Sequence, residues 1–249
     1  MKINEIYLGD CLELMPKYVD DKSIDMIFCD LPYGTTQNKW DTVIPLDKLW
    51  IEYKRVIKDK GVVVLFAAQP FTTTLINSNA KNFKYEWIWH KSKPSGVAFK
   101  LQPMRNHESI LVFDGGKFYP IKEEREGFTE SSIKRFSSGK NLGTYRNHGN
   151  STIGMGKTEL KPITKLRKPT TIKKFASVPN RLGTLHPTQK PLDLIEYMIK
   201  TYTNEGDLIL DNTCGSGTTG LGAKNLNRNY IMMEQDPKYF EIAKARVSE

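Results

Sequence analysis

Short apolar runs alternate with amphipathic stretches in both halves of the chain. The runs at residues 23–29, 61–67, 85–89, 109–113, 207–210 and 229–233 have the length and composition of strands. Residues 46–57, 191–202, 217–225 and 237–247 have helical spacing or follow helix-start signals. Strands alternating with helices predict a doubly wound α/β fold, in which helices cover both faces of a mostly parallel sheet.

The alternation is interrupted by a basic segment. Residues 117–181 hold 15 Lys and Arg against 5 Asp and Glu, which accounts for the whole net charge of +9. This segment is rich in Gly, Ser, Thr and Asn and has little helical or strand periodicity. It is either a solvated, partly disordered insertion or a surface that neutralises phosphates. Phe136, Tyr145 and Arg146 add planar groups that suit bases or sugars, but charge alone does not separate DNA from RNA or an acidic protein.

The composition excludes several other classes of protein. The chain has 249 residues, of which 39% are apolar, enough for a folded core. No signal peptide and no apolar run of about 18 residues is visible, so we expect a cytoplasmic protein without a membrane span. Cys11, Cys29 and Cys214 are widely spaced, and the four histidines lack ligand spacing, so neither a disulfide framework nor a metal site is expected.

The first candidate motif is FCDLPYG, at residues 28–34, directly after a predicted strand. In an open α/β sheet the carboxyl ends of the strands face the crevice where ligands bind. Asp30, Pro32 and Tyr33 would therefore face a ligand, for example a flat polar one. The alternative is an ordinary proline turn.

The second candidate motif is a glycine loop late in the chain. Gly215, Gly217 and Gly220 form G-x-G-x-x-G between a predicted strand and a predicted helix, and Glu234 ends the next strand 19 residues after Gly215. This spacing suits a nucleoside cofactor whose ribose hydroxyls bind the carboxylate. The alternative is a set of turn glycines with an unrelated surface glutamate.

Two cofactors fit this loop, namely a dinucleotide and S-adenosylmethionine. Only 15 residues follow Glu234, whereas a dinucleotide fold normally continues with further strands. Asp211, just before the glycines, is placed to hold the ammonium of a methionine moiety. S-adenosylmethionine is therefore favoured, and a dehydrogenase is a distant alternative.

The joint pattern resembles the beta group of DNA amino-methyltransferases, which modify adenine N6 or cytosine N4. DLPYG is similar to their D-P-P-Y motif, with Leu31 replacing the first proline, and DNTCGSGTTG to their cofactor loop. Further similar stretches are GDCLELM at 9–15, NHESILVF at 106–113 and HPTQKPLDLIEYMI at 186–199. The resemblance implies a Rossmann-like methyltransferase sheet with a circularly permuted motif order. Residues 1–115 and 182–249 would form the catalytic domain, and residues 116–181 the DNA target-recognition region.

The resemblance also implies roles for the first motif. Asp30 and the carbonyl of Leu31 would accept hydrogen bonds from the target NH₂, so that its lone pair faces the methyl group. Pro32 would stiffen the turn. Tyr33 would stack on a base that has been flipped out of the duplex.

The expected cofactor residues lie in five parts of the chain. Asp10 would bind the adenine amino group of the cofactor, unless it only caps the following helix, and Lys190 would pair with the methionine carboxylate, unless it is a surface lysine. Ser216 and Thr218 fit simple N-capping equally well. The full expected set is Asp10, Asp30, Lys190, Asp211, Thr213, Gly215, Ser216, Gly217, Thr218 and Glu234.

The expected DNA contacts are Lys39, Trp40, Lys134, Arg135, Arg146, Lys173 and Lys174. Trp40 is equally compatible with a core position. Cys29 and Cys214 are expected to pack in the core, because amino methylation needs no thiol.

These observations predict a site-specific enzyme that methylates N6 of adenine in double-stranded DNA. Cytosine N4 is the nearest alternative, disfavoured because the cytosine enzymes of this group often carry Ser in place of Asp30. An RNA or protein amide methyltransferase would share the cofactor loop, whereas a non-enzymatic DNA-binding protein would not need it. The resemblance further suggests a homodimer and a cognate restriction endonuclease. The recognised DNA sequence is not predicted.

Overall fold

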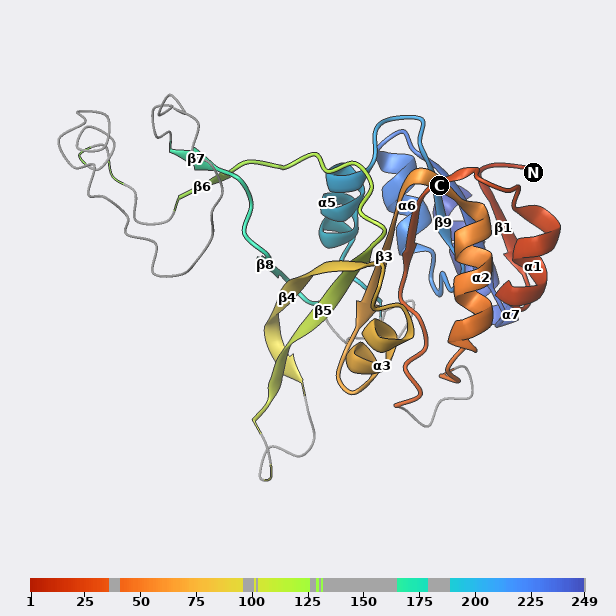
Figure 1. Cartoon of the computed structure of the whole chain (residues 1–249), viewed down its shortest axis with the longest axis horizontal. Helices are drawn as coiled ribbons and strands as arrows, with labels where there is room; N and C mark the ends of the chain where they lie inside the picture. The colour runs from red at the N-terminus through yellow and green to blue at the C-terminus, as the bar shows by residue number, and fades with distance from the viewer. Residues whose placement is uncertain are drawn as a thin grey trace. The chain divides into compact units, whose positions relative to one another are not determined.

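One twisted sheet contains every strand that the apolar runs predict. The computed structural model describes residues 1–35, 41–95, 101, 103–125, 129, 131, 165–178 and 189–248. Within them the sheet has eight strands, in the order β1-β10-β9-β2-β3-β5-β4-β8 (Figure 1). Their bounds are β1 Glu5–Leu8, β2 Ile24–Cys29, β3 Ile57–Ala67, β4 Phe83–Ser95, β5 Arg105–Phe113, β8 Ile172–Phe175, β9 Leu208–Asp211 and β10 Asn229–Glu234.

The order of the strands reverses in the middle of the sheet. Strands β1, β10, β9, β2 and β3 are mutually parallel, and β5 then pairs antiparallel with both β3 and β4. From β2 the chain proceeds to β3 on one side, whereas from β9 it proceeds to β10 on the other. The boundary between β2 and β9 is therefore a topological switch point, where α/β proteins bind their ligands.

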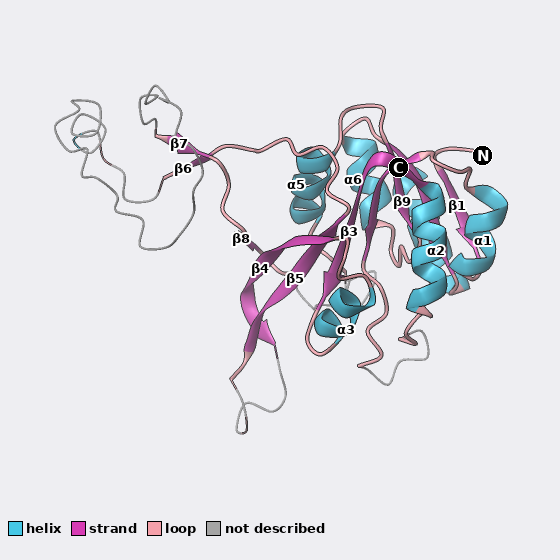
Figure 2. Ribbon diagram, viewed as in Figure 1, coloured by secondary structure: helices cyan, strands magenta, loops and turns pink. Residues whose placement is uncertain are grey.

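Helices cover both faces of the sheet (Figure 2). One core packs α1 Cys11–Tyr18, α2 Leu46–Val56 and α3 Phe71–Ser78 against the strands, and the other packs α5 Leu192–Tyr202, α6 Thr218–Asn225 and α7 Pro237–Ser248. Successive residues of β2 belong to opposite cores: Ile27 and Cys29 to the first, Met26 and Phe28 to the second. Burial on both sides explains why this strand reads as a continuous apolar run. The predicted fold class is confirmed.

Four elements differ from the sequence-based expectation. Helix α3 was not predicted, because FTTTLINS is short and rich in β-branched residues, which disfavour helices. Strands β4 and β5 extend past their apolar parts into polar residues. Strand β8, inside the predicted basic insertion, pairs in parallel with β4 at the sheet edge. Its sequence IKKF lacks the apolar run that marks the inner strands, and lysine is common on edge strands.

A second compact unit spans Pro120–Pro169, while Met1–Tyr119 and Thr170–Glu249 form the first. In the described part of the second unit, β6 Glu123–Glu124 pairs antiparallel with β7 Leu166–Arg167. Arg167 donates a hydrogen bond to Glu123 across this pair at 3.0 Å. The recognition-region boundaries 116–181 remain a prediction. None of the helices in the described residues is both long and apolar enough to cross a bilayer.

Candidate active site

A cavity of about 780 Å³ opens at the carboxyl ends of the parallel strands. The loops that follow β1, β2, β9 and β10 line it, together with side chains from β4 and β5. Asp30 follows β2, and Asp211 ends the adjacent strand β9. The two predicted motifs, 181 positions apart, therefore meet at the switch point.

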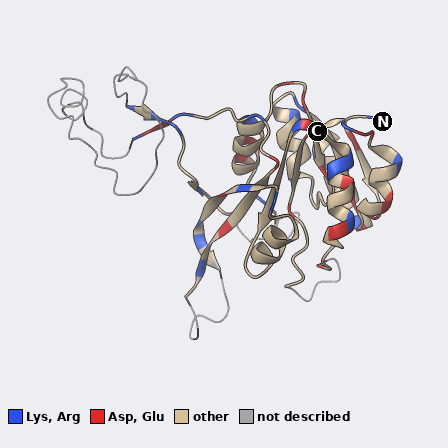
Figure 3. Ribbon diagram, in the orientation of Figure 1, with Lys and Arg blue, Asp and Glu red and all other residues tan. Residues whose placement is uncertain are grey.

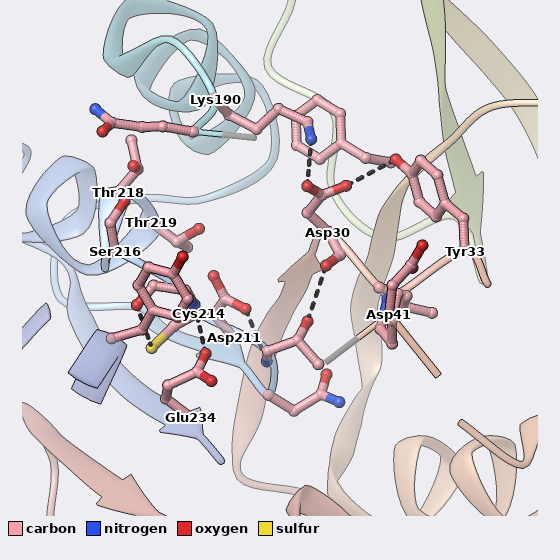
Figure 4. Close-up of a pocket in the computed structure, with 18 of the residues that line it drawn as sticks. Asp30, Tyr33, Asp41, Lys190, Asp211, Cys214, Ser216, Thr218, Thr219 and Glu234 are labelled. Atoms are coloured by element: carbon pink, nitrogen blue, oxygen red, sulfur yellow. Dashed lines mark hydrogen bonds and ion pairs between the residues drawn. The ribbon is translucent and has the colours of Figure 1, made fainter. Parts of the chain in front are cut away.

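Both carboxylate oxygens of Asp30 are engaged. Oδ1 accepts a hydrogen bond from the Tyr33 hydroxyl at 2.7 Å, and Oδ2 accepts one from the Lys190 ammonium (Figure 4). The backbone carbonyl of Asp30 accepts a bond from the Thr213 hydroxyl at 3.2 Å, which joins the two motifs. Burial raises the pKa of Asp30 above its ordinary value, although the Lys190 ammonium acts in the opposite direction.

The loop after Asp30 is held from two sides. The Tyr33 ring stacks on Phe71 of α3, with centroids 5.2 Å apart. The buried carboxylate of Asp41 accepts hydrogen bonds from the backbone N–H groups of Gly34 and Thr35, each at 2.9 Å. Asp41 was not predicted. These contacts fix the turn that follows Pro32 and leave the Tyr33 ring with one face already packed.

Lys190 is a buried residue rather than a surface lysine. It is 8% exposed, and its ammonium lies 4.9 Å from the centre of the Phe66 ring. Besides Asp30, it lies 3.7 Å from Oε2 of Glu108. Burial alone would lower the pKa of Lys190, but the two carboxylates raise it above its ordinary value. The pairing with Asp30 was not foreseen.

Glu108 of β5 is a second residue that sequence reasoning missed. Its Oε1 accepts a hydrogen bond from the ammonium of Lys91 on β4. Burial alone would raise the pKa of Glu108, but the ammonium groups of Lys190 and Lys91 lower it. The only sign of a functional role for Glu108 in the sequence was that it lies in NHESILVF, one of the stretches similar to the methyltransferase family.

The glycine loop has a conformation that requires glycine. Gly215 and Gly217 have φ values of 52° and 75°, and Gly217 is the residue before α6. A Cβ on Gly220 would lie 2.3 Å from the Met232 side chain of β10. The motif thus combines a tight turn with close packing of a helix on a strand.

Glu234 holds this loop. Its Oε2 accepts a hydrogen bond from the N–H of Gly215 at 2.8 Å, and its Oε1 accepts one from the N–H of Asp236 at 2.9 Å. It is 8% exposed, and burial raises its pKa. Each carboxylate oxygen can still accept a second hydrogen bond.

Asp211 is the most deeply buried carboxylate of the cavity. It is 4% exposed and accepts a hydrogen bond from the Thr213 N–H at 3.1 Å. Burial raises the pKa of Asp211 to about 7. A cationic ligand would stabilise its ionised form.

Of the remaining predicted cofactor residues, Asp10, Thr213, Gly215, Ser216 and Thr218 also line the cavity, whereas Gly217 is not among the residues that line it. Asp10 caps α1 by accepting a hydrogen bond from the Leu12 N–H at 2.7 Å. Ser216 and Thr218 do not cap α6 with their side chains; their hydroxyls accept hydrogen bonds from Arg246 at 3.3 and 2.8 Å. Arg246 of α7 was not predicted. Cys29 and Cys214 pack in the two cores, as expected.

The predicted DNA contacts are only partly within the described residues. Lys39, Trp40, Lys134, Arg135 and Arg146 lie outside them. Lys173 on β8 lies 5.9 Å from the ring of Trp87 and 5.6 Å from that of Tyr197. Lys174 is exposed.

A doubly wound sheet with a glycine loop and acidic strand ends at its switch point is typical of proteins that bind a nucleoside-containing ligand. The particular family follows from a comparison of sequences. The family model described as DNA methylase matches residues 24–245, and the chain belongs to that family.

Relatives agree with this membership, and solved structures share the fold. The Type II methyltransferase M1.MboII of Moraxella bovis is 27% identical, over 98% of this chain and 96% of that protein. M.HpaI of Haemophilus parainfluenzae is 27% identical, over 93% and 70%. The structure of an M1.HpyAVI–SAM complex superposes with a TM-score of 0.66 at 23% identity, over 98% and 99% of the two chains. PvuII DNA methyltransferase, a cytosine-N4-specific enzyme, gives a TM-score of 0.64 at 16% identity, over 99% and 86%.

Proposed function

We propose that this DNA methylase transfers a methyl group from S-adenosylmethionine to N6 of adenine in a specific duplex sequence. The observation that carries the proposal is the position of Asp30, at the end of β2 and beside Asp211, in one cavity with the glycine loop. An acceptor for the target amine and a binding site for a cationic cofactor then lie next to each other.

The cavity residues fit S-adenosylmethionine. A volume of about 780 Å³ suits a ligand of this size. Its acidic lining complements the sulfonium and ammonium charges, with Asp211 assigned to the ammonium and Glu234 to the ribose hydroxyls. Asp10 retains an acceptor oxygen for the adenine amino group of the cofactor. When bound, the cofactor supplies an electrophilic methyl group.

The chain's own residues prepare the target amine. The exocyclic nitrogen of adenine is a weak nucleophile because its lone pair is delocalised into the ring. Asp30 and the Leu31 carbonyl accept hydrogen bonds from this NH₂ and orient its lone pair, and Tyr33 stacks on the flipped base with the ring face not packed on Phe71. Catalysis then depends on positioning and electrostatics, without a covalent intermediate.

Adenine is preferred over cytosine because Asp30 occupies a position where cytosine enzymes of this group often carry serine. The fold does not distinguish adenine from cytosine, because the cytosine-N4-specific PvuII enzyme has the same fold. The test is to incubate the protein with methyl-labelled S-adenosylmethionine and unmodified DNA, digest the DNA, and identify the labelled nucleoside by mass spectrometry. N6-methyladenine supports the proposal, N4-methylcytosine corrects the base, and unlabelled DNA contradicts the function.

Duplex DNA is the proposed macromolecular substrate. Lys84, Lys91 and Lys93 belong to β4, and Figure 3 shows the positions of basic residues, coloured blue, spaced along this strand. Lys93 also lines the cavity. The Type II relatives support a place in a restriction–modification system. A homodimer and a cognate endonuclease remain predictions from the resemblance.

Lys174→Ala should weaken DNA binding and flatten its salt dependence, by about 0.9 in the slope of log affinity against log salt for one lost phosphate contact. Lys173→Ala should have a smaller effect on the slope, because the Lys173 ammonium lies over two aromatic rings. Fluorescence anisotropy at several salt concentrations measures both. Lys48→Ala, an exposed change on α2, is the matched control. A Lys174→Ala slope equal to that of the control would remove β8 from the DNA-binding surface.

Cofactor affinity should depend on pH through Asp211. Because the pKa of Asp211 is raised to about 7, the carboxyl binds a proton below that pH and must release it to pair with the ammonium. Affinity should therefore rise from pH 5.5 to 7.5, by up to about tenfold per pH unit below the pKa. Calorimetry in buffers of different ionisation enthalpy measures the affinity and the released proton. Asp211→Asn should bind more weakly, with a flatter profile; an unchanged profile would contradict the assignment.

A further inference from the structure

Asp30 is one of four charged side chains that form a continuous series, here called the charge chain. Lys190 bonds to Oδ2 of Asp30 and lies 3.7 Å from Oε2 of Glu108, whose Oε1 accepts a hydrogen bond from Lys91. Two ammonium groups and two carboxylates sum to zero charge. The charge chain links Asp30, which follows β2, to strands β4 and β5 through Lys190, which lies two positions before the start of α5.

The position of the Lys190 ammonium controls the acceptor strength of Asp30. A carboxylate that bonds directly to an ammonium has less negative charge available for a third group. In the structure Asp30 is in this state, since Oδ2 binds Lys190 and Oδ1 binds Tyr33. Full polarisation of a target amine requires the ammonium to withdraw without leaving its buried site.

Glu108 provides the alternative acceptor. Its side chain is 14% exposed, and its buried Oε2 has no hydrogen-bond partner among the residues that the structure describes. A buried carboxylate oxygen in this state is costly, and one new hydrogen bond would relieve the cost. Charge-assisted bonds are about 2.8 Å long, so the ammonium has to move only about 1 Å towards Glu108. Lys91, 5.0 Å from the centre of the Trp89 ring, holds the other oxygen in place.

Building on the proposed function, we infer that Glu108 is a positioning residue that takes up the Lys190 ammonium when the target amine binds Asp30. The transfer keeps the Lys190 ammonium paired with a carboxylate, while Asp30 bonds to the Tyr33 hydroxyl and the target amine. It also leaves Lys190 with a donor for the methionine carboxylate, because an ammonium has three. Glu108 thereby acts on the reaction through Lys190, without touching either substrate.

The pKa of Asp30 depends on the charges of Glu108 and Lys190. Four charged or titratable groups interact with Asp30: Tyr33 of its own loop, Glu108 of β5, Lys190 before α5 and Asp211 of β9. Asp41 acts on Tyr33, and Lys91 of β4 acts on Glu108. Glu108 is a like charge that raises the pKa of Asp30, whereas Lys190 lowers it. Removing the Glu108 charge also leaves Lys190 to pair with Asp30 alone.

The test is the pH dependence of single-turnover methyl transfer at saturating DNA and cofactor. Glu108→Gln keeps the size of the side chain and should lower the plateau rate about tenfold. It should also move the acidic limb of the pH–rate profile to lower pH by about one pH unit. Lys91→Met should move the same limb to higher pH, because it removes a positive charge from the chain. Opposite shifts from two neighbouring residues are not expected from general loosening of the site.

Glu86→Gln is the matched control, because it removes an exposed carboxylate from β4 outside the charge chain. It should change neither the plateau rate nor the acidic limb of the pH–rate profile. Cofactor affinity and melting temperature verify that each variant is folded. A lower rate without a shifted limb, or no change in Glu108→Gln, overturns the inference while the proposed function stands. Absence of methyl transfer by the unaltered protein overturns the proposed function itself.

Discussion

Replacing Asp30 with alanine is expected to slow methyl transfer by at least about 100-fold, the typical effect of losing one preorganised transition-state hydrogen bond. The carboxylate is the only group in the DLPYG motif that offers a full negative charge to the target amine. Single-turnover transfer at saturating DNA and cofactor measures the chemical step directly. DNA binding should persist, because the proposed phosphate contacts lie on other elements.

The same variant should remain folded. Removing Asp30 leaves the buried Lys190 ammonium with Glu108 at 3.7 Å, so the cation keeps a partner. Circular dichroism checks the fold, and Asp59→Ala, which removes an exposed carboxylate that pairs with Lys22, is the control. If Asp30→Ala transfers methyl groups at the unaltered rate, DLPYG is an ordinary turn.

The parts of the site that could be predicted are those attached to buried parallel strands. Cys29 and Leu210 lie on adjacent strands of a sheet covered on both faces, so their apolar runs are easy to recognise. The residues that follow such strands must then lie at one edge. This reasoning placed Asp30 at the ligand crevice and Asp211 and Glu234 beside the glycine loop, and the structure brings all three to one cavity.

Residues that enter the site through strand pairing or across the chain could not be predicted. Glu108 and Lys91 meet only because β5 pairs antiparallel with β4, and neither has a local pattern that distinguishes it from a surface charge. Lys190 was expected to bind the cofactor, but its bond to Asp30 spans 160 positions. Long-range pairing of charges depends on the sheet order, which periodicity does not encode.

Local rules also competed with one another in the glycine loop. Ser216 and Thr218 are residue types that often cap helices. However, Gly217, in a left-handed conformation, is the residue before α6, and Arg246 donates hydrogen bonds to both hydroxyls. Here a tertiary contact with α7 replaced the local capping interaction. The alternative of simple N-capping is therefore wrong for these two side chains.

Glu234→Ala is expected to weaken S-adenosylmethionine binding about 10- to 100-fold, since each lost charge-assisted hydrogen bond contributes about 1.5–3 kcal/mol. Two effects act in the same direction. The ribose hydroxyls lose their proposed acceptor, and the N–H of Gly215, which now bonds to Oε2 at 2.8 Å, loses its partner. Calorimetric titration with the cofactor measures the change, and DNA binding without cofactor should be unaffected.

The control must separate lost ribose contacts from a loosened loop. Asp236→Ala removes the carboxylate that accepts hydrogen bonds from the N–H groups of Lys238 and Tyr239 at the start of α7, two residues beyond Glu234. It should lower the melting temperature with little change in cofactor affinity. S-adenosylmethionine analogues without ribose hydroxyls complete the test, because they should bind Glu234→Ala and the unaltered protein with nearly equal affinity. If the analogues keep the full difference between the two proteins, Glu234 acts only by holding Gly215, and the ribose assignment is wrong.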